Sequence, residues 1–284
     1  MAVWSGATSN ENLYLPKPNE FIPTDFELAV RDTKHTLGAI VPAILEETPL
    51  SRLWFLQDTE FLLPKACISL ELFSTLAYAS PHHSNLTQMF VRVFQDALTE
   101  YAYDAELAGL WYAFSATKYG MSLDIRGYQQ KQDVLLDKII KQMKSFVVDG
   151  RRFEILKEAY VRALKNFEME QPHTHASYRM QVLMTDKVWT KEELFQAATD
   201  DKLTAESLQA FIHELLGRIK IDMFVHGNLT PEKAKSILTT VENHLKDGAM
   251  PLPANVVLRQ RQTALEAGVP RYVCQNLLSL MYYF

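Results

Sequence analysis

Three stretches in which apolar and polar residues alternate constrain this chain more than any other feature. They cover residues 68–72, 121–126 and 219–226, where Phe224 breaks the pattern. Because successive side chains of a strand point to opposite faces of a sheet, a period of two predicts strands with one buried and one wetter face. Such strands are typical of antiparallel or mixed sheets. A fourth strand with a less regular pattern is predicted over residues 52–58.

Segments with the apolar spacing of a helix lie between these stretches. Apolar residues recur every three or four positions over residues 134–146 and 153–167, which predicts amphipathic helices. Residues suited to helix starts stand at three places: Asp149, Thr190 with Glu193, and Thr230 with Pro231. The order of these elements predicts an α+β fold, in which a mixed, largely antiparallel sheet carries helices packed on one face.

The prolines divide the chain into three predicted parts. Residues 1–33 contain three prolines that disfavour continuous helix, so we expect an extended leader that ends a preceding domain. Residues 34–254 are expected to form one domain. After two further prolines beyond residue 250 another strand is predicted, and residues 255–284 are expected to be the truncated start of a following domain, because their apolar end would expose hydrophobic surface.

The composition excludes several functional classes. The formal net charge of −5 argues against a nucleic-acid binder, which usually carries a basic face. The sequence shows neither a secretory signal nor an apolar run long enough to span a bilayer. The two cysteines, Cys67 and Cys274, are far apart and suit a reducing compartment. We therefore expect a cytoplasmic protein that binds neither nucleic acid nor membrane.

The histidines do not form the motif of a zinc peptidase, which needs two imidazoles four residues apart on one helical face. The nearest match begins at His213 and Glu214, but Gly217 stands where the second histidine belongs, so we expect a solvated helix edge. His82 and His83 are expected at a helix entry, where adjacent rings point apart.

His173 and His175 leave two interpretations open. Alternating histidines beside Pro172 could converge on a metal ion in extended or turn geometry, or they could simply belong to the polar start of a helix. The sequence also contains no Ser–His–Asp order, glycine-rich phosphate loop or catalytic cysteine. We therefore predict no catalytic residue, metal or cofactor in this chain.

Tyr101 and Tyr103 are predicted to face in different directions. They lie about 200° apart on a helix, so only one can join the core with Leu98 and Leu107. The other faces outward, where a phenol offers an apolar surface and a polar tip suited to peptide binding. A purely structural role remains an equal alternative.

Several separate blocks of this sequence, in one order, resemble the insulysin/pitrilysin family of zinc metallopeptidases. The blocks are NEFIPTDFEL (19–28), LWFLQDTEFLLPKA (53–66), EYAYDAELAGL (100–110), YGMSLDIRGY (119–128), RRFEILKEAYVRALKNFEMEQPHTHA (151–176) and HGNLT (226–230). In that family, four homologous domains of the mitochondrial-processing-peptidase-like metallohydrolase type form two bowl-shaped halves around a peptide. The zinc motif H-x-x-E-H lies in the first domain.

The resemblance implies that this chain comprises the end of the second domain, the whole third domain and the first residues of the fourth. It implies a non-catalytic segment that supplies chamber wall and substrate contacts, with zinc held elsewhere in the full-length enzyme. Its partners would be peptide substrates and the catalytic half of the same enzyme.

The resemblance also implies roles for three residues. Tyr103 would face the substrate, and His173 would lie near the chamber wall, where its imidazole could hydrogen-bond a peptide carbonyl. Arg261 would lie at a subunit contact of a homodimer, although an exposed linker arginine is the alternative. Residues 1–10 and 266–284 depart from the family, which indicates a truncated gene model or an alternative transcript. The alternative function is a truncated isoform that acts as a peptide-binding or regulatory partner of a full-length peptidase.

Overall fold

A mixed sheet forms the centre of the molecule. The computed structural model describes residues 18–29, 41–246, 249–253 and 261–269. The strand order is β1-β2-β6-β3-β5-β4, and β7 pairs with β6 beside this path. The strands are β1 Ala43–Glu47, β2 Ser51–Gln57, β3 Lys65–Phe73, β4 Trp111–Thr117, β5 Gly120–Tyr128, β6 Arg218–Gly227 and β7 Met250–Pro251.

The four strands expected from the sequence are confirmed as β2, β3, β5 and β6. Among the described strands, β2 and β7 run parallel to β6, whereas the other pairs are antiparallel. The predicted sheet type, mixed and largely antiparallel, is therefore correct. The strand expected after Pro251 and Pro253 falls on residues 254–260, which lie outside the described ranges; the short β7 precedes it.

The helices begin where the capping residues predict. Asp149 accepts hydrogen bonds from the backbone N–H groups of Arg151 and Arg152, and Thr190 and Glu193 form the expected reciprocal capping box. Thr230 caps a helix that starts at Pro231. The helices are α1 Pro81–Leu107, α2 Gln132–Lys144, α3 Gly150–Asn166, α4 Pro172–Met184, α5 Lys191–Ala198, α6 Ala205–Gly217 and α7 Pro231–Leu245.

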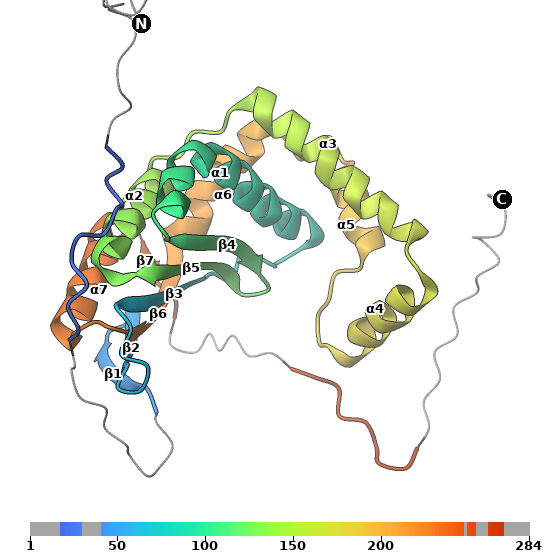
Figure 1. Ribbon diagram of the computed structural model, residues 1–284. Coiled ribbons are helices and arrows are strands. Elements are labelled where there is room, and N and C mark those ends of the chain that lie inside the picture. The colour runs from blue at the N-terminus through green and yellow to red at the C-terminus, as the bar shows by residue number, and fades with distance from the viewer. Residues whose placement is uncertain (1–17, 30–40, 247–248, 254–260, 270–284) are drawn as a thin grey trace, which may run out of the picture.

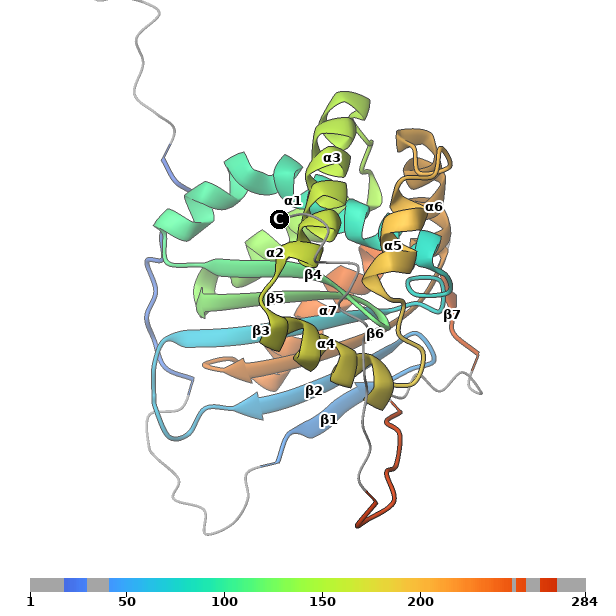
Figure 2. The ribbon, with the colours of Figure 1, turned by 90° about the vertical axis from the view of Figure 1, so that its right-hand side faces the viewer.

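The layers are visible in two perpendicular views. Helices α2 and α7 cover one face of the sheet, and α1 crosses its β4 edge (Figures 1 and 2). Helices α3 to α5 extend away from the sheet as an arm, and α4 lies across from the opposite sheet face (Figure 2). The predicted α+β fold is thus confirmed, with the arm as an addition that helical spacing did not reveal.

The core lies between the sheet and its covering helices. The apolar positions of the three alternating stretches are all buried, from Ile68, Leu70 and Leu72 on β3 to their partners on β5 and β6. Val134, expected in the apolar stripe of α2, is instead 36% exposed. No helix within the described ranges is long and apolar enough to cross a membrane.

The described part of the leader, residues 18–29, packs along the body of the protein. Phe21 is buried and meets the ring of Tyr101 edge-on at 5.1 Å. Asn228 fixes the other end, because its Nδ2 donates to the Glu27 carbonyl and its Oδ1 accepts from the Ala29 N–H. The boundaries at residues 33 and 254 stay predictions, since residues 30–40 and 254–260 lie outside the described ranges.

Candidate functional site

Tyr103 lies on the outer side of α1 and is 59% exposed. Tyr101 faces inward and donates its hydroxyl proton to Glu20 Oε1 at 3.1 Å. The predicted division between the two tyrosines is therefore confirmed. Leu98 is buried as expected, but the prediction for Leu107 was wrong: it is 65% exposed, because it lies about 180° around α1 from Leu98.

His173 is exposed in the first turn of α4, a helix that buries none of its described side chains. The ring of His175 instead packs against Phe167, with 4.7 Å between ring centroids. Because α4 begins at Pro172, the two imidazoles point in different directions and do not converge on a metal ion. The interpretation as a polar helix start is the one that the structure supports.

An aromatic cluster attaches α4 and the following loop to the body. The backbone N–H of Trp189 donates to the Tyr78 hydroxyl at 2.9 Å, and its indole N–H donates to the Tyr78 carbonyl at 3.1 Å. The Lys191 N–H donates to the Tyr178 hydroxyl at 2.7 Å. Lys118, in the turn between β4 and β5, donates to the Asp186 carbonyl. These bonds hold α4 at a distance from the sheet.

Arg261 is exposed, and its backbone lies beside the end of α4. Its carbonyl accepts from the Asp186 N–H at 3.1 Å, and two residues later the Thr263 N–H donates to the Met184 carbonyl at 2.8 Å. His173 and Arg261 are thus associated with opposite ends of α4. The end of α1, which carries Tyr103, lies on the far side of the molecule from α4 (Figure 1), so the structure does not bring the three predicted residues together.

The zinc that the family resemblance implies does not fit the described residues. His213 and Glu214 lie exposed on α6, where Leu215 and Leu216 are buried, and Gly217 ends the helix. Within the described ranges, no three His, Cys, Asp or Glu side chains lie close enough together to hold a metal ion.

The sheet face that points away from α2 and α7 carries polar and aromatic side chains; we call it the open face. Strand register aligns its side chains in three rows that cross the sheet. The sequence showed these side chains as the polar half of each alternating stretch, but it did not show which residues of neighbouring strands lie opposite each other. The rows are Arg52–Asp222–Glu71–Ser122–Ser115, Trp54–Phe224–Ser69–Asp124–Ala113 and Leu56–His226–Cys67–Arg126–Trp111.

Three carboxylates lie near the centre of the open face. Burial raises the pKa of Glu71, and the neighbouring charges of Asp124 and Asp222 raise it further, while the Ser122 hydroxyl lowers it. Burial also raises the pKa of Asp222, which Arg52 counteracts. Asp124 accepts a hydrogen bond from Ser69 at 2.5 Å. Glu71 is thus the carboxylate whose described neighbours are serine and other acids rather than cations.

Aromatic rings flank the carboxylates. Trp54 carries the Arg52 guanidinium over its ring at 5.8 Å, and Phe224 stacks on His226 with 6.1 Å between centroids. The open face therefore offers flat apolar surfaces beside hydrogen-bonding and charged groups, a combination that suits contact with a peptide. Burial raises the pKa of Cys67 on the same face, which keeps it a thiol rather than a nucleophilic thiolate at neutral pH.

A small apolar hollow of about 180 Å³ borders the open face beyond the ends of β2 and β6. Phe61 and Leu63 line it from the loop before β3, together with Cys67 and His226 from the third row. Both loop side chains are exposed. Apolar contact surface thus continues past this end of the sheet.

Comparison with known proteins identifies related sequences and structures. The family model described as the middle or third domain of peptidase M16 matches residues 1–197. The human insulin-degrading enzyme is 46% identical over 264 residues, which cover 92% of this chain and 25% of that protein. The insulin-degrading enzyme of Drosophila melanogaster is 37% identical over 271 residues, covering 93% of this chain and 27% of that protein. A Schizosaccharomyces pombe protein named as a zinc protease is 33% identical over 92% of this chain and 26% of its own length.

Solved structures show the same fold. The crystal structure of pitrilysin has a TM-score of 0.73 at 21% identity, over 82% of this chain and 24% of that one. An M16 inactive domain from Pseudomonas fluorescens has a TM-score of 0.56 at 14% identity, over 78% of this chain and 54% of that one. The chain spans about a quarter of the length of the relatives whose sequences it matches.

Proposed function

The chain belongs to the M16 peptidase family as a middle or third domain, and on this premise we propose that it forms non-catalytic wall of a closed peptide chamber. The observation that carries the proposal is the open face, a half-buried surface of aromatic and charged side chains that none of the described helices covers directly. An extended peptide can lay its side chains on such a surface while its polar groups meet serines and carboxylates.

In this role the chain binds and orients peptides, and the peptide bond is cleaved at a site outside this chain. The catalytic half of an insulysin-like zinc metallopeptidase is the proposed partner. Tyr103 and His173 are proposed as additional substrate contacts because both side chains are exposed, one on each side of the domain. Arg261 stays a predicted homodimer contact; if it serves as one, Arg261→Ala would weaken self-association in analytical ultracentrifugation.

Peptide binding to the open face tests the proposal. A fluorescently labelled, extended peptide is titrated with the full chain, and anisotropy reports its dissociation constant. Trp54→Ala and Phe224→Ala each remove an aromatic surface from the second row and should weaken binding severalfold. Ile155→Ala is the matched control, because Ile155 is an exposed apolar residue on α3, outside the open face.

Equal affinity of all four proteins for the peptide would refute binding at the open face. Two further measurements separate binding from catalysis. The zinc-supplemented chain should give no chelator-sensitive cleavage of a fluorogenic peptide by itself. Mixed with a catalytic half, it should co-elute in size-exclusion chromatography, and failure to do so at micromolar concentration would count against the proposed pairing.

A further inference from the structure

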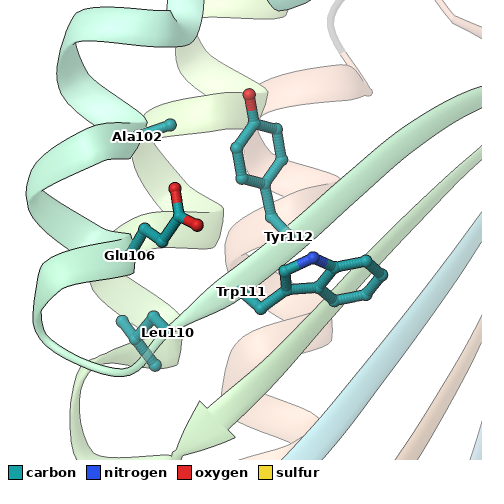
Figure 3. Close-up of a pocket in the computed structure, with 5 residues that line it drawn as sticks. All are labelled: Ala102, Glu106, Leu110, Trp111 and Tyr112. Atoms are coloured by element: carbon teal, nitrogen blue, oxygen red, sulfur yellow. The ribbon is translucent and has the colours of Figure 1, made fainter.

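A pocket of about 110 Å³ lies where α1 ends and β4 begins, next to Tyr103. Ala102 and Glu106 of α1 line it on one side, and Leu110, Trp111 and Tyr112 line the other. Figure 3 shows the Glu106 carboxylate extending from α1 toward the Tyr112 ring, with the Trp111 indole beside them. Ala102 and Leu110 are buried and give the pocket an apolar base.

The pocket lies between α1 and the β4 edge of the sheet and meets the open face at Trp111. Trp111 occupies the β4 end of the third row, paired with Arg126 on β5, whereas Tyr112 points to the opposite side of the strand. Tyr103 lies three residues before Glu106 on α1, and Leu107 lies four residues after Tyr103, so Glu106 and Leu107 are both helical neighbours of Tyr103; Tyr103 and Leu107 are exposed. A peptide that crosses the open face can therefore reach this pocket at its margin.

The polar groups of the pocket have no described partner. Among the described residues, no hydrogen bond or ion pair is found for the Glu106 carboxylate, the Tyr112 hydroxyl or the Trp111 indole N–H, although the Glu106 charge acts on Tyr112. The last turn of α1 carries no basic side chain, although the partial negative charge of a helix C-terminus favours one there. Burial, with a further contribution from Glu106, raises the pKa of Tyr112, so its hydroxyl remains protonated at neutral pH.

The lining selects a particular ligand chemistry. A carboxylate beside aromatic rings attracts a cation through both charge and the electron-rich ring faces, while an apolar base accepts the methylene stem of a long side chain. Trp111 already shows this preference, since the Arg126 guanidinium lies 5.3 Å from its ring centroid on the open face. A small metal cation would fit poorly, because it would have to give up hydrating water and the apolar walls offer too few oxygen ligands to replace it.

We propose that this pocket is a specificity subsite that takes the arginine or lysine side chain of a bound peptide, with Glu106 as its ion-pair partner and Trp111 as its aromatic wall. The inference rests on the proposed peptide-binding role and adds a preference to it: peptides with a suitably placed basic residue bind more tightly than neutral ones.

Two labelled peptides test this subsite on the full chain. Both are extended, N-acetylated and C-amidated, and they differ only in one position, which holds arginine or its neutral analogue citrulline. The wild-type protein should prefer the arginine peptide by about tenfold, the size expected when an ion pair and a cation–π contact act together. Glu106→Gln should reduce this preference severalfold, because it removes the ion pair and leaves the Trp111 contact, while the affinity for the citrulline peptide stays unchanged.

Glu100→Gln is the matched control, because it makes the same change on an exposed position of α1 outside the pocket. It should retain the arginine preference, and near-ultraviolet circular dichroism should show that both variants keep the native fold. Equal affinity of the wild-type protein for both peptides would overturn the subsite but leave the chamber-wall proposal intact. An equal loss of preference in both variants would also overturn it, since it would reveal a general charge effect. Failure of both peptides to bind would refute the wall proposal and the subsite together.

Discussion

Tyr160→Phe tests how the arm is joined to the body of the protein. Tyr160 of α3 is buried, and its hydroxyl donates to Asn85 Oδ1 on α1 at 2.8 Å. Asn85 is fully buried and also links α1 to α5, because its Nδ2 donates to the Leu194 carbonyl at 2.9 Å. Removing one hydroxyl leaves a buried amide oxygen without its donor, which costs ~1–3 kcal/mol of unfolding free energy.

The titration of Tyr160 reports the burial of the same phenol. Burial raises the pKa of Tyr160 to about 12, whereas an unfolded tyrosine has a pKa of about 10. The folded state therefore favours the protonated phenol, and this contribution is fully present below pH 10. It is lost as pH rises from 10 to 12, and two pKa units correspond to ~2.7 kcal/mol.

Urea unfolding of the wild-type protein and of Tyr160→Phe measures this directly. The variant should be less stable by ~1–3 kcal/mol at pH 7, and the two proteins should converge as pH rises above 10, because phenylalanine does not titrate. Tyr103→Phe is the control, since its exposed hydroxyl should change stability by less than ~0.5 kcal/mol. A Tyr160→Phe stability equal to wild type at pH 7, or a difference that stays constant up to pH 11, would refute the reasoning.

Three further perturbations follow from single contacts. Asp149→Ala should lower stability by ~1 kcal/mol, because it removes the acceptor of two N–H groups at the start of α3, whereas Asp149→Asn should retain most of it; thermal unfolding would distinguish them. Gly227→Ala should cost ~2 kcal/mol or more, since Gly227 has φ of +124° and a Cβ there would lie 2.5 Å from the Lys65 carbonyl; wild-type stability would contradict this. Glu71→Gln should stabilise the protein at pH 7, because the raised pKa of Glu71 means that its charged form disfavours folding. That advantage should vanish in urea unfolding at a pH below ~4, where both folded and unfolded states hold the proton.

Local patterns predicted the elements of this fold well, because their causes are local. The alternation that marks β3, β5 and β6 reflects which side chains are buried, and the caps at Asp149 and Thr190 satisfy donors within three residues. The burial of Leu107 was misjudged because nine residues separate it from Leu98, which places the two side chains about 180° apart on a helix. Leu107 therefore lies on the exposed side of α1, with Tyr103.

The arrangement of the site could not be predicted in the same way. The open face depends on β2 lying parallel to β6, so that Trp54 meets Phe224 across a long separation in sequence. A period of two fixes the side of each residue but not the neighbouring strand or the register. The position of α4 depends on Tyr78 and Trp189, whose contacts join distant segments and leave no periodic trace.

The charges of the open face restrict which segments can dock on it. Glu71 and Asp222 stand directly opposite each other on β3 and β6, and like charges in such a pair oppose strand pairing. A sheet face built only to be covered by a helix would place apolar residues there, as the other face of these strands does. Packing an apolar element over Glu71 would remove its remaining hydration without providing a cation, at a cost of several kcal/mol. Any segment that docks on this face must therefore bring water, hydrogen-bond donors or positive charge to its centre, which are groups that a bound peptide can supply.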